Sequence, residues 1–239
     1  MGRDQTTLRR QGISGPMGWP ILVSILPGLL ILRHIRQTWS PQAPRGLLWS
    51  HLFAGASIAM LALVLELALK EPLLQILPIS FAVFGTAFVV AALLEEGVKA
   101  VGIKAAADRA RDRHLTVPNI MGVALTVSLG FGIAETCLYA LANPHKAIAV
   151  ALIRYCSAIP LHYLNGSLFA VAYIERRIAI RNEVAWMFLV VVVAHGFYDY
   201  VIMLNDEESG LAFMVLGALW AYSRWQIRRM QAAQAIVAP

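Results

Sequence analysis

The chain has 239 residues, of which 59% are hydrophobic and 14% are charged, and its formal net charge is +6. Soluble domains carry about 25% charged residues, so this composition excludes an ordinary soluble domain. Several apolar runs approach the ~20 residues that a membrane-crossing helix needs. The basic residues form short clusters between these runs, which is typical of an integral membrane protein and argues against a nucleic-acid partner. We expect one membrane domain over residues 1–239, folded as an all-α polytopic transmembrane helical bundle.

The first half of the chain contains three apolar runs that we expect to cross the membrane, at residues 17–32, 46–69 and 73–105. The first run is short and contains two prolines, so a half-inserted segment is the alternative. Glu66 and Lys70 lie near the end of the second run and are expected at the membrane interface, before a turn at Pro72. Pro78 could separate an interfacial lead-in from the rest of the third run.

The second half contains further apolar runs at residues 116–142, 147–174, 184–204 and 211–222. The last of these is short. Together with the first half, they predict a bundle of about seven spans, or of six if the first run does not cross.

The distribution of basic residues predicts how the bundle lies in the membrane. Lysine and arginine concentrate in segments 33–45, 104–113 and 176–181 and after residue 224. The positive-inside rule places these segments in the cytoplasm. Seven spans would then put the basic N-terminus, with Arg3, Arg9 and Arg10, outside. Six spans without the first run would put it inside.

Two adjacent carboxylates and a lysine, Glu95, Glu96 and Lys99, lie near the end of the third run. A charge at the bilayer centre costs ~2.5–3.5 kcal/mol on insertion scales, so their presence needs a reason. In a helix, Lys99 is a neighbour of both carboxylates, because side chains three or four residues apart are close. Lys99 can therefore hold one carboxylate ionised while the other is free for chemistry. The structural alternative is a helix end with its charges among lipid head groups.

The fourth run contains Phe131 and Glu135, with apolar residues on both sides of the acid. Glycines beside them allow another helix to approach closely. An ionisable residue inside the membrane is a functional candidate by default. The structural alternative is a protonated, hydrogen-bonded acid at a helix contact.

The fifth and sixth runs each carry a histidine. Arg154 in the fifth run is expected to neutralise a nearby carboxylate, and His162 follows a proline that frees a backbone carbonyl. In the sixth run His195 and Asp199 are four residues apart and share a helical face. Asp199 could therefore orient the imidazole of His195 or act as a ligand beside it.

These groups are expected at one depth in the membrane. Counted from the predicted ends of their runs at ~1.5 Å per residue, four of them lie between the middle and the outer third of the bilayer. They are Glu95, Glu135, His162 and His195. A single water-filled site shared by four helices explains this better than four independent coincidences.

The order of these motifs resembles that of the PrsW family of membrane proteases, a branch of the superfamily that includes CAAX prenyl proteases and Abi immunity proteins. The resemblance covers roughly residues 73–204 and is carried by Glu95-Glu96-x-x-Lys99, Phe131-x-x-x-Glu135, His162 after Pro160, and His195-x-x-x-Asp199. In the CAAX branch the second motif ends in histidine and the third in asparagine. Glu135 and Asp199 at these positions favour PrsW and put a prenylated substrate in doubt.

The resemblance implies hydrolysis of a peptide bond inside or beside the membrane. The substrate that it implies is a single-span membrane protein of the anti-sigma-factor kind in a bacterial plasma membrane, so the expected partners are that protein and the lipid bilayer. The catalytic residues implied by the motifs are Glu95, Glu96, Glu135, His195 and Asp199, with Lys99, Phe131, His162 and Arg154 in support.

Two mechanisms fit this set of residues. In the first, Glu95 is the general base, Glu135 orients the water, and His195 and Asp199 face the oxyanion or protonate the leaving amine. In the second, one divalent metal ion, zinc by preference, is bound by Glu96 (or Glu95), Glu135, His162 and His195. The second is favoured because a cation relieves the repulsion among several acids, but no HExxH pair is present, and both stay open.

Two other classes of protein also gather ionisable residues in the membrane. A proton- or ion-coupled transporter does so, but such proteins often show internal repeats or paired broken helices, and the sequence has no repeat. A non-catalytic immunity or scaffold protein is the other alternative.

Overall fold

The computed structural model describes residues 18–112, 116–177, 183–204 and 209–237. These residues fold almost entirely into helices, which confirms the predicted all-α membrane bundle. Arg3, Arg9 and Arg10 lie outside the described residues, as do parts of the basic segments 104–113 and 176–181.

The first two helices are longer than the sequence predicts. Helix α1 spans Gly18–Trp39 and helix α2 spans Arg45–Ile76. The turn predicted at Pro72 is wrong, because α2 passes through this proline and ends just before Pro78. A residue that precedes proline is driven out of the helical region, and Leu77 accordingly has extended backbone angles, φ −81° and ψ 139°.

The third span changes helix type directly before the first motif. The short turn η2 (Ile79–Phe81) and helix α3 (Ala82–Phe84) lead into η3 (Gly85–Leu93), a π-helix of nine residues. Helix α4 (Leu94–Asp112) follows without a break. π-helical turns are rare and occur frequently at functional sites. The two adjacent carboxylates of the first motif thus stand in the first turn of α4, where the wider helix ends.

The remaining helices follow the predicted order. They are α5 (Val117–Ala142), α6 (Ala147–Cys156), α7 (Ala158–Arg177), α8 (Val184–Leu204) and α9 (Ser209–Val237), with a short turn η4 (Pro144–Lys146) before α6. Helix α8 has the bounds that the sequence predicts. Helix α9 is much longer than the short run at 211–222.

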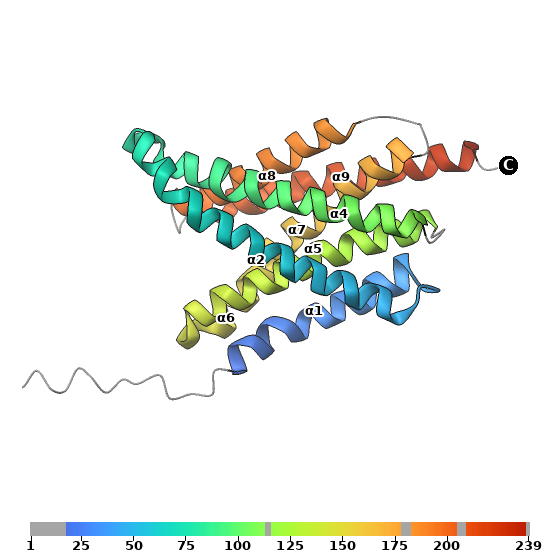
Figure 1. The fold of residues 1–239 in the computed structure, drawn as a ribbon, viewed down its shortest axis with the longest axis horizontal. Coiled ribbons are helices and arrows are strands. Elements are labelled where there is room, and N and C mark those ends of the chain that lie inside the picture. The colour runs from blue at the N-terminus through green and yellow to red at the C-terminus, as the bar shows by residue number, and fades with distance from the viewer. Residues whose placement is uncertain (1–17, 113–115, 178–182, 205–208, 238–239) are drawn as a thin grey trace, which may run out of the picture.

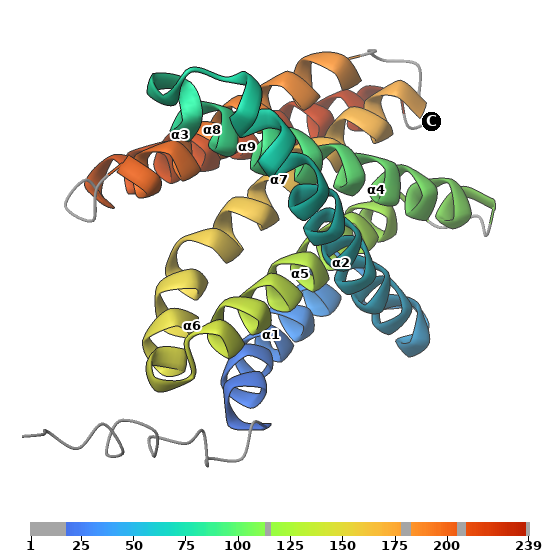
Figure 2. The ribbon, with the colours of Figure 1, turned by 60° about the vertical axis from the view of Figure 1, so that its left-hand side comes forward.

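The predicted fifth span is two helices. Helix α6 ends at Cys156 and α7 begins at Ala158, and Ser157 between them has φ −132° and ψ −74°. Pro160 explains the break, since a proline ring clashes with the carbonyl four residues earlier, which is that of Cys156. Figure 2 shows the resulting change of direction between α6 and α7.

Helix α5 forms the centre of the bundle and contacts α1, α2, α4, α6 and α7 (Figure 1). It crosses α2 closely at two glycines. A Cβ on Gly55 would meet the carbonyl of Val127, and one on Gly130 would meet the carbonyl of Leu52. Figures 1 and 2 show that the two helices cross at a wide angle and separate beyond the crossing.

Six helical stretches of the described residues are long and apolar enough to cross a membrane. The first of them is α1, so the first run qualifies by length and composition. Helix α9 does not, because its apolar part is followed by Arg224, Arg228 and Arg229. The sequence allowed six spans if the first run does not cross. The structure also has six candidate spans among its described residues, but the run that does not qualify is the last one, in α9.

One buried ionic cluster joins the ends of three helices away from the motifs. Arg229 of α9 donates through Nη2 to both carboxylate oxygens of Glu175 on α7, at 2.9 and 2.8 Å. The same nitrogen donates to Glu183, just before α8, at 3.1 Å. Glu175 is 1% exposed, so this arginine satisfies a carboxylate that would otherwise be buried without a partner.

Candidate active site

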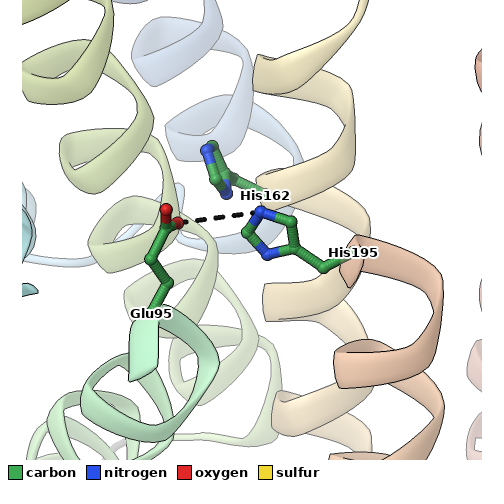
Figure 3. A group of neighbouring side chains, drawn as sticks. All are labelled: Glu95, His162 and His195. Atoms are coloured by element: carbon green, nitrogen blue, oxygen red, sulfur yellow. Dashed lines mark ion pairs between the residues drawn. The ribbon is translucent and has the colours of Figure 1, made fainter. Parts of the chain in front are cut away.

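The acids and imidazoles that the sequence places on different spans lie in one buried cluster. They are Glu95 and Glu96 at the start of α4, Glu135 on α5, His162 on α7 and His195 on α8. Figure 3 shows Glu95, His162 and His195 pointing toward one another from three helices. The cluster predicted from the depth of the motifs is therefore present in the fold.

Glu96 is fully buried and accepts three hydrogen bonds on one oxygen. The donors to its Oε1 are Lys99 Nζ at 2.7 Å, Asn165 Nδ2 at 3.0 Å and His195 Nδ1 at 2.6 Å. Bonds to an ionised group are about twice as strong as neutral ones, so three of them fix this carboxylate and its partners. The geometry suits a group that orients its neighbours.

His195 faces Glu95 through its other nitrogen. His195 Nε2 lies 3.8 Å from Glu95 Oε2 (Figure 3) and 3.3 Å from Asp199 Oδ2, so a protonated Nε2 donates toward Asp199. Glu95 Oε2 is buried and has no hydrogen-bond partner among the described residues. Because buried polar atoms are nearly always paired, this oxygen marks a place where a water, a substrate atom or an ion would be accommodated.

Lys99 and His162 form the second half of the cluster. Lys99 is 1% exposed, and its Nζ lies 2.9 Å from His162 Nδ1, 3.6 Å from Glu95 Oε2 and 4.3 Å from the centre of the Phe131 ring. His162 Nε2 lies 2.7 Å from Glu135 Oε2. An imidazole that accepts from the ammonium on Nδ1 donates to the carboxylate from Nε2, so both nitrogens of His162 are engaged.

Arg154 neutralises Glu135, as expected for a carboxylate in its neighbourhood. Its Nη2 lies 2.6 Å from Glu135 Oε2, its Nε donates to Thr136 Oγ1 at 3.2 Å, and its guanidinium lies 4.3 Å from the centre of the Tyr139 ring. The side chains of Glu135 and Arg154 are 19% and 14% exposed, whereas Glu95 and Glu96 are almost completely buried. Glu135 therefore lies at the accessible side of the site.

Sequence reasoning gave no role to two residues that the structure brings to the cluster. Asn165 is buried and binds Glu96. Its spacing of three from His162 on the same helix was a usable signal. Glu66 of α2 was assigned to the membrane interface, but α2 continues to Ile76, and the half-buried Glu66 lies within electrostatic range of Glu135 and His195.

The cluster provides donors for a metal ion. Ligand atoms of Glu95, His162 and His195 all lie within 4.8 Å of one another. One carboxylate and two imidazoles suit zinc, and the unpaired Glu95 Oε2 fits this use as it stands. His195 Nε2 would exchange its contact with Asp199 at 3.3 Å for the metal ion. His162 would have to release one of its two hydrogen bonds. Glu96 and Glu135, which the sequence-based ligand set includes, instead contact the two imidazoles, and that set stays a prediction.

Together these features define a polytopic membrane protein with an acid and imidazole site buried between its spans. The chain matches the model of a protein family described as "PrsW family intramembrane metalloprotease" over residues 43–223, which is well over half of its length. The chain thus belongs to the PrsW family and is a membrane-embedded protease. The match confirms the resemblance seen in the motifs, extends beyond residues 73–204, and does not favour a transporter.

Searches of curated proteins and of solved structures gave no match. The family assignment therefore rests on the family model and is consistent with the six apolar helices. It implies that the protein acts on membrane proteins in contact with lipid.

Proposed function

We propose that the protein cleaves a peptide bond of a single-span membrane protein with a water held between Glu95 and His195. The observation that carries this proposal is the buried Glu95 Oε2, which has no hydrogen-bond donor among the described residues and faces His195 Nε2 at 3.8 Å. A carboxylate in this position is free to accept a proton, whereas Glu96 and Glu135 are held by other side chains.

The residues support a complete hydrolysis. Glu95 accepts a proton from the water while the water oxygen bonds to the carbonyl carbon of the scissile amide. The C–N bond then breaks, and the leaving nitrogen takes up the proton. His195, held at Nδ1 by Glu96 and adjacent to Asp199, lies where it can stabilise the oxyanion or deliver that proton. Lys99 and Glu135 hold His162 from both sides.

A divalent metal ion, zinc by preference, would be held by Glu95, His162 and His195. When bound, such an ion makes a coordinated water more acidic and polarises the scissile carbonyl. Glu96 and Glu135 would then contact the outer nitrogens of the two imidazole ligands, the usual position of carboxylates that orient metal-binding histidines.

The substrate proposed from the family resemblance is a membrane-bound protein of the anti-sigma-factor kind in a bacterial plasma membrane. The basic segments of the protease would face the cytoplasm there, as the positive-inside rule requires. The acids and imidazoles of the site lie in spans, so the scissile bond is expected within or next to the substrate's own membrane segment.

Co-expression with tagged single-span membrane proteins, followed by mass analysis of the products, tests the proposal. Glu95→Gln and His195→Ala should abolish cleavage with expression unchanged. Glu71→Gln, which alters an exposed acid at the far part of α2, should cleave as the unmodified protein does. Full cleavage by the Glu95 and His195 variants would exclude this site as the centre of the reaction.

A further inference from the structure

The two cations of the site are each committed to a carboxylate. Lys99 Nζ lies 2.7 Å from Glu96 Oε1, and Arg154 Nη2 lies 2.6 Å from Glu135 Oε2. Asp199, which is 19% exposed, adds a further acid beside His195. The accessible side of the site is therefore rich in carboxylates, and its cations are already paired.

Glu66 extends this acidic side onto a fifth helix. Ala59 and Ala62 of α2 are buried against Phe131 of α5. Glu66 is seven and four residues beyond these alanines and lies on the same helical face, while Glu135 is four residues beyond Phe131. Both acids therefore lie one helical turn beyond the packed contact between Ala62 and Phe131.

Glu66 lies near the site without an ion pair of its own. Its carboxylate is within electrostatic range of Glu135, Asp199, His195 and Lys99, and the ammonium of Lys99 is paired with Glu96 at 2.7 Å. No hydrogen bond or ion pair joins Glu66 to another residue in the described part of the chain. Its helix neighbours Val64 and Leu67 are 60% and 67% exposed, as expected for side chains that contact lipid. A charged ligand of this carboxylate must therefore come from outside the protein.

We propose that Glu66 determines substrate specificity by binding a lysine or arginine side chain next to the scissile bond. This inference rests on the proposed function. The occupant is a substrate side chain because Glu66 shares a helical face with Ala59 and Ala62, which pack against Phe131. Phe131 in turn contacts Lys99 and His162 of the site, beside which the substrate peptide binds. A metal ion is less suited, since the two imidazoles converge on Glu95. The amine of a lipid head group would have to leave the interface to reach a carboxylate among lipid-facing leucines and valines.

The test uses three single-span reporters that differ in one residue next to the cleavage site, which is Lys, Gln or Glu. Cleavage is measured with the full-length protease in phosphatidylglycerol vesicles, whose head groups carry no amine. The unmodified protease should cleave the Lys reporter roughly fivefold or more faster than the Glu reporter, with the difference in KM, because one partly exposed ion pair contributes about this much. Glu66→Gln should bring the ratio close to one, and Glu66→Lys should reverse it.

Controls separate this inference from the proposed function and from misfolding. Glu71→Gln, an exposed acid on the same helix, should keep the ratio of the unmodified protease. Equal cleavage of all three reporters by the unmodified protease, or an unchanged ratio in Glu66→Gln, would overturn the role of Glu66 and leave the protease assignment intact. Failure of the unmodified protease to cleave any reporter at a site that depends on Glu95 would instead overturn the proposed function and this inference with it.

Discussion

The molecule contains two buried ionic clusters that differ in one respect. At the ends of α7 and α9, Arg229 contacts both oxygens of the buried Glu175. In the candidate active site, three donors hold Glu96 Oε1, whereas Glu96 Oε2 and the neighbouring Glu95 Oε2 have no hydrogen-bond partner among the described residues. Buried charge alone therefore does not mark function, because a fully satisfied pair holds helices together equally well. The feature that indicates chemistry is an unpaired oxygen that also faces an imidazole nitrogen, as Glu95 Oε2 faces His195 Nε2.

The largest effect should come from removing the charge of that oxygen. Glu95→Gln keeps the size of the side chain but cannot accept a proton from water, so cleavage of a single-span reporter should fall on the order of a hundred- to ten-thousand-fold. The melting temperature in detergent, measured for both proteins in chelator, should change little, because the ion pairs that Glu95 makes with Lys99 and His195 are long, at 3.6 and 3.8 Å. If the variant keeps its activity, or unfolds at a much lower temperature, then Glu95 has a structural role like that of Glu175.

Metal analysis sharpens the comparison next. We expect about one divalent ion per purified chain, and we expect His195→Ala and Glu95→Gln to lose it. Glu135→Ala should weaken metal binding by about 10–100-fold, since Glu135 contacts the imidazole of His162 from its outer side. Elemental analysis after dialysis at graded chelator concentrations measures this order. Loss of metal only in Glu135→Ala and in a Glu96 variant would instead support the ligand set predicted from the sequence.

A smaller effect is expected at Asn165. Asn165→Ala removes one of three donors to Glu96 and leaves the bonds from Lys99 and His195. Cleavage should fall by roughly tenfold, in kcat more than in KM, since the asparagine positions a group that does not bind substrate. Reporter kinetics give both constants. A change in the melting temperature alone, with kcat unchanged, would show that Asn165 has a structural role and does not position Glu96 for catalysis.

The structural cluster should show the opposite pattern, with the smallest effect on activity. Arg229→Ala leaves Glu175 buried without its donor and should lower the free energy of unfolding by about 1–3 kcal/mol, a range kept low because Arg229 is 24% exposed. The folded fraction should cleave the reporter normally. Arg228→Ala, at an exposed neighbouring position, is the matched control for denaturation and activity. A selective loss of activity in Arg229→Ala would contradict this division.

The sequence predicted the meeting of the motifs because helical periodicity and depth are both readable from spacing. His195 and Asp199 share a face as expected, and Arg154 contacts Glu135. The division of labour between Glu95 and Glu96 was not predictable, since adjacent residues on a helix face different neighbours and only the packed bundle selects one. Pro160 accounts for the break at Ser157. The helix that Arg154 contacts from the end of α6 could be known only from the packed bundle.

Glu66 was given no role in the site for a related reason. The apolar run appeared to end near Leu69, so a charge there suggested the lipid head groups. The helix in fact continues through Pro72 to Ile76, and the approach of α2 to α5 at Gly55 and Gly130 turns this face toward the site. Hydropathy measures where a helix can cross lipid, and it contains no information about the face that a second helix will cover.

The number of residues in the π-helix Gly85–Leu93 determines how the carboxylates of the first motif are oriented toward α8. Within it Phe88 packs against Gly196 of α8, and just beyond it Glu95 faces His195 of the same helix. Deleting one residue between Phe88 and Glu95 would rotate Glu95 about the helix axis relative to the Phe88 contact. Every motif would keep its residues and internal spacing, yet the carboxylates would no longer meet the imidazoles. A homologue shortened here would therefore be inactive for a reason that a motif search cannot detect.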